Sequence, residues 1–167
     1  MQQMSQLRRS LTWATVLTIG VAVVALAGDG QGPRCKTIRA TLVEDLATTG
    51  CNPPHTSCFL GEVKGNGFRA TTHFKADSGA AGPSTSPDFR SYSGLFEYRT
   101  RHGTIFTRET GVVNGTTGTP ASGAVTAHQQ IIDANGELTG ATGHFFVSGF
   151  SIGGHVETIV NAEICYP

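Results

Sequence analysis

The sequence predicts an all-β protein, a single antiparallel up-and-down barrel of about eight strands. Three observations indicate this class. No window from residue 35 onward has a helical period, apolar and polar residues alternate in several segments, and glycine-containing turns separate those segments. A barrel is preferred to a sandwich because consecutive hairpins can close on themselves and leave no exposed edge.

Residues 1–27 have the features of a cleaved signal peptide. Arg8 and Arg9 form a positive start, an uncharged apolar run follows, and the small residues ending at Ala27 make a cleavage site. The alternative is a retained membrane anchor, which the short run and the polar residues after it disfavour. The expected mature chain, residues 28–167, forms one domain and is secreted or periplasmic, with no membrane attachment after cleavage.

The net charge of the expected mature chain bears on two classes of partner. Removing Arg8 and Arg9 from the 12 basic residues leaves 10, against 12 acidic residues. A chain so close to neutral does not favour nucleic acid or an anionic membrane surface.

Four cysteines, all in the expected mature chain, predict two disulfides. Cys51 and Cys58 bracket a proline-rich turn, so a local bridge between them is expected. Cys35 and Cys165 lie near the two ends of the mature chain, and a bridge between them would join the first strand to the last. Zinc is the rival interpretation, but Cys-x6-Cys is not a zinc-finger spacing and no histidine pair is suitably placed, so no metal or cofactor is expected.

Three segments show the strand pattern most clearly. Ile38, Ala40 and Leu42 share one face near the start of the mature chain. Segments 68–76 and 156–164 show the same period of two, with apolar residues at every second position except Thr72 and Thr158, which is typical of half-buried strands.

Turns between strands are predicted from glycine-containing segments. The clearest is Asn135-Gly136, because a type I′ hairpin turn needs positive φ at both central residues. Gly140 and Gly143 follow inside or beside the next strand, where glycine marks a bulge or a sharp bend. The other expected turns and loops are 64–67, 77–88, 101–103, 114–123 and 152–154.

The segment NGELTGATGHFFVSG, residues 135–149, resembles the glycine-kinked hairpin of secreted barrels related to allene oxide cyclase and plant dirigent proteins. The resemblance covers this hairpin and the eight-strand rhythm. Glycine-rich hairpins also occur in avidin-like and lipocalin-like (calycin) barrels. The resemblance implies an apolar lumen that binds small hydrophobic molecules and, in some members, guides a cyclisation or coupling. It carries over no catalytic residue.

The hairpin from Leu95 to Gly111 contains the first candidate site residue. A two-residue turn at His102-Gly103 would place Glu97 opposite Arg108 on the outer face. The same turn would point Glu109 into the lumen. A carboxyl group that loses water there would have a raised pKa and could act as acid, base or ligand partner. A shift of one residue, or a place at the rim, would put Glu109 in water instead. The expected inner set is Phe96, Tyr98, Ile105, Thr107 and Glu109.

The strand at 123–133 contains the second pair of candidates. His128 and Gln130 share one face, Gln129 lies on the other, and each face therefore carries a polar residue in mid-strand. If the first face is turned inward, His128 and Gln130 could orient a ligand carbonyl. An exposed histidine is the alternative.

Three functions stay open, and the sequence does not decide whether the protein is an enzyme. One is a secreted barrel that binds a small hydrophobic molecule; another is a cyclase or isomerase that uses Glu109 or His128 in the same cavity; the third is a structural or interaction module of the envelope with a packed lumen. A homo-oligomer is compatible with each. The segment Gly149 to Gly153 reads G-x-S-x-G, but it lacks the flanking strand-to-helix pattern of a nucleophile elbow, which disfavours a serine hydrolase. The aromatic residues expected to line the cavity are Phe59, Phe68, Phe74, Phe96, Tyr98 and Phe145.

Overall fold

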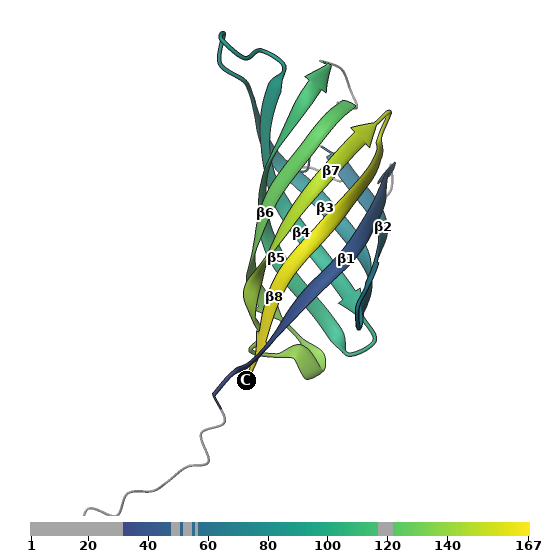
Figure 1. Ribbon diagram of the computed structural model, residues 1–167, viewed down its shortest axis with the longest axis vertical. Coiled ribbons are helices and arrows are strands. Elements are labelled where there is room, and N and C mark those ends of the chain that lie inside the picture. Colours follow the sequence, from purple (N-terminus) through teal and green to yellow (C-terminus); the bar gives the residue numbers. More distant parts are fainter. Residues whose placement is uncertain (1–31, 48–50, 52–54, 56, 117–121) are drawn as a thin grey trace, which may run out of the picture. The chain divides into compact units, whose positions relative to one another are not determined.

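The computed structural model describes residues 32–47, 51, 55, 57–116 and 122–167, so the predicted signal peptide lies outside the described residues. Eight antiparallel strands pair in sequence order, and β8 returns to β1 to close a barrel (Figure 1). The predicted all-β, up-and-down, eight-stranded barrel is confirmed. The strands are β1 (Arg34–Ala47), β2 (Ser57–Gly65), β3 (Phe68–Ala81), β4 (Phe89–Thr100), β5 (Gly103–Thr116), β6 (Ser122–Ala134), β7 (Thr142–Ile152) and β8 (His155–Tyr166).

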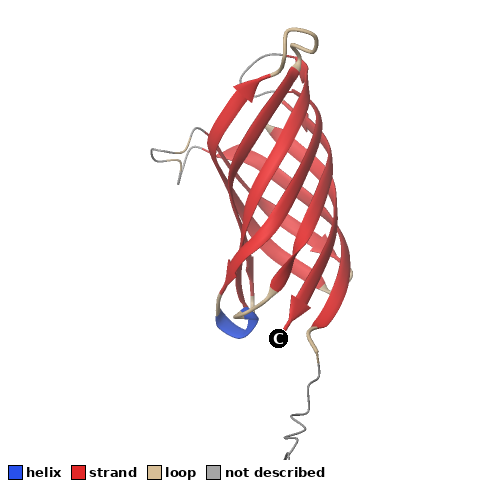
Figure 2. Ribbon diagram, turned by 90° about the vertical axis from the view of Figure 1, so that its left-hand side faces the viewer, coloured by secondary structure: helices blue, strands red, loops and turns tan. Residues whose placement is uncertain are grey.

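The two ends of the barrel differ in how they are covered. A short 3-10 helix, η1 (Gly136–Leu138), lies at the end where the chain finishes (Figure 2). Leu138 packs against the core and Ala141, just after η1, is buried within it. We call this the closed end. The opposite end, where β3 finishes and β4 begins in exposed residues, is called the open end.

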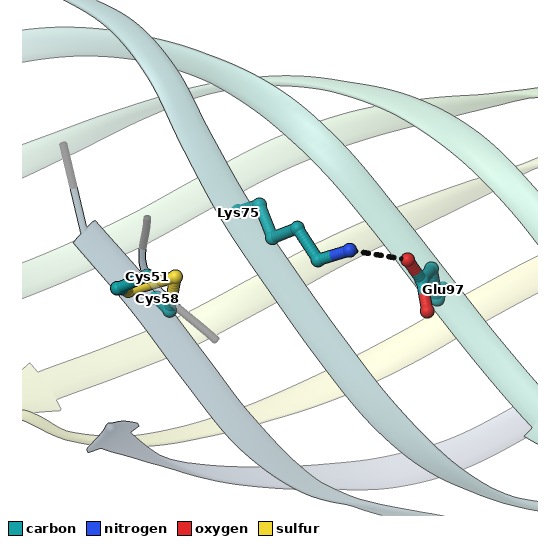
Figure 3. Close-up of a disulfide and its surroundings, with 4 residues drawn as sticks. All are labelled: Cys51, Cys58, Lys75 and Glu97. Carbon is teal, nitrogen blue, oxygen red and sulfur yellow. Dashed lines mark hydrogen bonds and ion pairs between the residues drawn. A yellow bond between two sulfur atoms is a disulfide. The ribbon is translucent and has the colours of Figure 1, made fainter. Parts of the chain in front are cut away.

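One disulfide lies near each end of the barrel. Cys35 of β1 lies directly opposite Cys165 of β8, and the bridge between them fastens the closing pair of strands. Cys51 and Cys58 form the second bridge, at the start of β2 (Figure 3). Both predicted pairings are confirmed, and two such bridges indicate an oxidising compartment. No helix in the part of the chain that the structure describes is long and apolar enough to cross a membrane.

The β4–β5 hairpin turns one residue earlier than predicted. Thr100 pairs with Gly103, so the two-residue loop is Arg101-His102. The Thr100 hydroxyl fixes this position because it donates to the Gly103 carbonyl at 2.9 Å and accepts from the backbone N–H of His102 at 3.0 Å.

The pairing register of this hairpin is therefore two residues away from the predicted one. Glu97 lies opposite Phe106 instead of Arg108, and Arg108 lies opposite Leu95. The predicted pairing of Glu97 with Arg108 is wrong. A shift of two residues keeps every side chain on its face, so the predicted inner set of β4 and β5 still points inward.

The predicted type I′ turn at Asn135-Gly136 is also wrong. Asn135 is extended, with φ −126° and ψ 179°, and only Gly136 has positive φ. Asn135 instead continues the contact with β5: its N–H donates to the Thr104 carbonyl at 2.9 Å, and its side-chain oxygen accepts from the Thr104 N–H at 2.8 Å. These bonds hold the chain against β5, so the return to β7 needs the η1 turn.

The glycines after this turn lie where the sequence placed them but do not form bulges. Gly140 precedes β7, Gly143 is inside it, and the pairing of β7 with β8 is continuous across Gly143. Register irregularities lie elsewhere, between Ala76 and Ser78 and between Phe106 and Thr107.

Candidate functional site

The barrel interior is divided into a packed half and a hollow half. In the half next to the closed end, large inward side chains fill the lumen. The Tyr98 and Phe145 rings stack at 4.5 Å between centroids, and Phe68 contacts both rings, at 5.8 Å from Tyr98 and 6.1 Å from Phe145. Tyr98 and Phe145 have no exposed surface.

The half next to the open end contains a cavity of about 520 Å³. It extends to the exposed rim formed by the ends of β3 and β4, including Arg90. Its wall is mainly apolar, with a few polar side chains. The apolar wall includes Leu42, Phe59, Phe74, Ala76, Phe96, Val113, Val125, Val147 and Val156, and the polar groups below the rim are Glu44, Tyr92, Glu109, Ser151 and Thr158.

Two inward glycines make room for the polar groups of the cavity. A Cβ atom on Gly61 would lie 2.7 Å from Cγ of Glu44, so the Glu44 side chain lies across Gly61. A Cβ atom on Gly111 would lie 2.4 Å from the hydroxyl oxygen of Tyr92, so the Tyr92 ring lies across Gly111. Any side chain at these positions would displace the carboxyl group or the phenol.

Glu44 is a buried carboxyl group on β1, with 5% of its surface exposed. The Thr72 hydroxyl of β3 reaches across Gly61 and donates to Oε1 of Glu44 at 2.8 Å. Burial and, to a smaller extent, the negative charge of Glu109 raise the pKa of Glu44 to about 8, although the Thr72 hydrogen bond opposes the rise. Near neutral pH, Glu44 is therefore predominantly protonated.

Glu109 is a second buried carboxyl group, on β5. The Gln129 side chain donates to its Oε2 at 2.5 Å, and the Tyr92 hydroxyl also bonds to it. Burial raises the pKa of Glu109 to about 7, although the hydrogen bonds from Gln129 and Tyr92 act in the opposite direction. The Glu109 carboxyl group can therefore exchange a proton near neutral pH.

A chain of hydrogen bonds connects Glu109 to the packed half. The Tyr98 hydroxyl donates to Oε1 of Gln129 at 2.6 Å, and the Gln129 amide then donates to Glu109. Burial and the nearby carboxylates raise the pKa of Tyr98 well above its usual range, so its hydroxyl stays a donor. This fixed order of donors orients the Glu109 carboxyl group.

Thr158 of β8 adds an unpaired hydroxyl group to the cavity wall. Only 2% of Thr158 is exposed, and its Oγ1 has no hydrogen-bond partner among the described residues. It lies opposite Leu42 of β1 and opposite Gly149 of β7.

The structure separates the predicted aromatic lining into two groups. Phe59, Phe74 and Phe96 line the cavity together with Glu109. The other three predicted lining residues, Phe68, Tyr98 and Phe145, belong to the packed half.

The structure turns His128 and Gln130 outward, which is the alternative to the inward position considered from the sequence. Both residues are exposed on the outer face of β6, where His128 stacks with His144. The inward face of this strand carries Gln129, which is fully buried because both ends of its amide are bonded inside the lumen. Gln129 is therefore the polar residue of β6 that reaches the site.

Sequence analysis missed Glu44 as a site residue although its signal was present. The alternation of Ile38, Ala40 and Leu42 continues to position 44, so the face was known. The alternation along the strand does not show that Glu44 and Glu109 line the same cavity.

Ion pairs on the outer face involve the residues expected there, with different partners. Lys75 of β3 contacts Oε1 of Glu97 at 2.7 Å (Figure 3), Arg99 contacts Oε2 of Glu97 at 2.5 Å, and Arg108 pairs with Asp77. The Glu97 side chain is 12% exposed and that of Asp77 is 23% exposed, so these pairs are partly buried.

Within the described residues, Cys35, Glu163 and Cys165 are close enough together to suggest metal ligands. The two sulfur atoms are joined in a disulfide, so this group does not offer thiolates to a metal.

Comparisons of the chain with family models, with curated proteins and with solved structures found no match. The resemblance to allene oxide cyclase and dirigent barrels stays a prediction. The function is inferred from the geometry of the cavity.

Proposed function

We propose that this chain is a secreted binding barrel that holds a small, mainly apolar molecule in the hollow half of its lumen. The observation that carries the proposal is the cavity of about 520 Å³, which has an apolar wall and two buried carboxyl groups. Cavities of roughly 300–1,000 Å³ with a few convergent polar groups are typical small-molecule sites. A cavity of this size favours binding or catalysis over a barrel whose lumen is wholly packed.

A neutral polarity-sensitive dye, N-phenyl-1-naphthylamine, tests the binding proposal. Val147→Phe would put a ring into the cavity and should weaken dye binding at least about tenfold, which is about 1.4 kcal/mol. Thr126→Phe is the matched control, because Thr126 is exposed on the outer face of β6. The proposal fails if the parent does not bind the dye, or if Val147→Phe binds it as tightly as the control does.

We also propose that the chain is exported and loses residues 1–27. The two disulfides support export because such bridges persist in oxidising compartments. Expression of the full chain in an exporting host, followed by intact-mass measurement of the recovered protein, tests this proposal. The expected mass corresponds to residues 28–167 with both bridges formed; a recovered chain that retains residues 1–27 contradicts it.

Proton-transfer catalysis, as in a cyclase or isomerase, is a second proposal, and one observation favours it. Glu109 titrates near neutral pH and receives hydrogen bonds from Tyr92 and Gln129, so it is oriented as a general acid or base. Small molecules that stay bound to protein from its native host can be identified by mass spectrometry and incubated with fresh protein. Turnover that Glu109→Gln abolishes supports catalysis, whereas an unchanged ligand supports binding alone.

A further inference from the structure

We propose that the ligand of this cavity is a hydrophobic amine, whose ammonium group lies among the side chains of Glu44, Glu109 and Thr158. This inference rests on the binding function proposed above and specifies its ligand class. It follows from where the polar groups of the cavity lie and from which of their atoms already have partners.

The two carboxyl groups come from opposite walls of the barrel. In a closed eight-stranded barrel, β5 is four strands away from β1 in either direction. Glu44 of β1 and Glu109 of β5 nevertheless line the same cavity, and the charge of Glu109 acts on Glu44. Two acids that face one space from opposite sides repel each other when both are ionised, and a cation between them removes that repulsion.

The polar groups below the rim offer acceptors more than donors. Thr72 occupies Oε1 of Glu44, whereas Glu109 accepts from Gln129 at Oε2 and also from the Tyr92 hydroxyl. Each carboxylate has further lone pairs for a ligand. Arg90 is exposed at the rim. Below the rim, the described lining contains no lysine or arginine side chain. The N–H groups of an ammonium ion would supply the further donors that these carboxylates lack.

Thr158 is the independent observation that points to a ligand. Its hydroxyl oxygen is buried in the cavity wall and has no partner among the described residues. An unpaired buried hydroxyl costs free energy, so a partner is expected in the bound state. A primary ammonium group has three N–H donors, which match two carboxylates and one hydroxyl.

The rest of the ligand is expected to be apolar. The wall around the carboxyl groups includes Phe59, Phe74 and Phe96, and the cavity volume admits a molecule of drug size or smaller. A metal ion would leave this apolar wall without a role, and an acid would place its charge against two carboxyl groups.

The pH dependence of binding separates an amine from a neutral ligand. An ammonium group binds the ionised carboxylates, whose pKa values are about 8 for Glu44 and about 7 for Glu109. Binding therefore releases protons, and affinity rises with pH through this range. A neutral alcohol bonds to the protonated acids and should bind more weakly as pH rises. Tyr92 and Tyr98 stay neutral, because burial raises the pKa of each well above its usual range.

Three probes with one alkyl chain test the inference: octylamine, octanol and octanoate. Calorimetry at pH 6, 7 and 8 should show octylamine binding at least about tenfold more tightly than octanol at pH 8, and gaining at least about tenfold in affinity from pH 6 to pH 8. Repeating the titration in two buffers of different ionisation enthalpy should show proton release. Equal affinity for octylamine and octanol at pH 8, or octylamine affinity that does not change with pH, overturns the inference.

Substitutions at the three proposed contact residues test which side chains produce the preference for octylamine. Glu44→Gln with Glu109→Gln keeps the shape of the cavity and should reduce octylamine affinity to that of octanol. Thr158→Val should weaken octylamine and leave octanol within about twofold. The matched control is Glu157→Gln, which removes one carboxylate from the outer face of β8 and should change neither. If the double variant does not fold, each single Gln variant should lose part of the pH dependence, and an unchanged profile in both contradicts the inference.

The outcomes also distinguish this inference from the proposed function. If octanol and the neutral dye bind but octylamine has no advantage, the barrel is a binding protein and only the amine assignment is wrong. If none of the probes nor the dye binds, both proposals fail.

Discussion

The packed half and the hollow half of this barrel are built from the same eight strands, and they differ only in which side chains point inward. Next to the closed end the inward positions carry large residues such as Tyr98, Phe145 and Ile105, which are fully buried. Next to the open end they include Gly61 and Gly111. The alternating pattern therefore sets the wall, while side-chain volume at the inward positions decides whether the lumen is core or cavity.

This difference suggests that the packed half supplies stability and the hollow half supplies the binding site. Apolar burial is concentrated in the packed half, whereas the acids with raised pKa values lie in the hollow half. Buried acids of this kind are unfavourable for stability when ionised and are typical of functional sites. The chain from Tyr98 through Gln129 to Glu109 crosses the boundary, so the rigid half orients the polar group of the other.

The largest expected effect compares one phenylalanine from each half. Phe145→Ala should lower the free energy of unfolding by about 3–5 kcal/mol, because it removes a fully buried ring from the packed half. Phe59→Ala should cost less than about 2 kcal/mol, because its ring is half-buried and already borders the cavity. Urea unfolding of both variants measures the difference, and equal losses would mean that the two halves are equally well packed.

The disulfides at the two ends provide the next comparison. Replacing Cys35 and Cys165 by Ser should cost roughly 4 kcal/mol, because their bridge closes a loop with a sequence separation of 130. Replacing Cys51 and Cys58 should cost about 2 kcal/mol, because that separation is 7. Thermal unfolding measures both, and a larger loss at the open end would show that strand closure is not the main contribution.

The buried acids should make stability depend on pH. Their folded pKa values lie above the ordinary value of 4.5, so the folded state favours the protonated form. That contribution is fully present below about pH 4.5 and is lost as pH rises through about 7 for Glu109 and about 8 for Glu44.

The expected loss between pH 5 and pH 8, summed over both groups, is on the order of 6 kcal/mol. Glu44→Gln with Glu109→Gln should remove most of it, which denaturant unfolding across this pH range would measure. A parent and a double variant with parallel pH profiles would show that these carboxyl groups are not desolvated.

The smallest expected effect compares two alanines of equal burial. Ala162, which lies opposite Phe145, and Ala76, which lines the cavity, are both 5% exposed. Ala162→Leu should cost about 1–3 kcal/mol through overpacking, whereas Ala76→Leu should cost less than about 1 kcal/mol because the cavity accepts the added carbons. The melting temperatures of the two variants report the difference. If Ala76→Leu is the more damaging, the hollow half has less room than its volume indicates.

Local sequence patterns predicted the architecture because they depend on neighbours in the chain. Alternation identified the inward faces of β1, β3 and β8, and cysteine positions identified both disulfides. The inward position of Glu109 followed from a hairpin whose predicted register was two residues off, since such a shift preserves the face. Where two faces looked alike, as around His128 and Gln130, the pattern alone could not choose.

The candidate site itself was decided by tertiary structure. Glu44 and Glu109 are 65 positions apart in sequence and meet because closing the barrel turns opposite strands toward one lumen. Gln129 replaced Gln130 as the inner polar residue because both ends of its amide find partners only inside. Asn135 stayed extended because it bonds Thr104 of a neighbouring strand. The sequence by itself determined which residues alternate and which cysteines can pair, because these are local properties. Only the closed barrel decided which polar groups share a cavity and lose water together, because desolvation depends on every wall that surrounds a group.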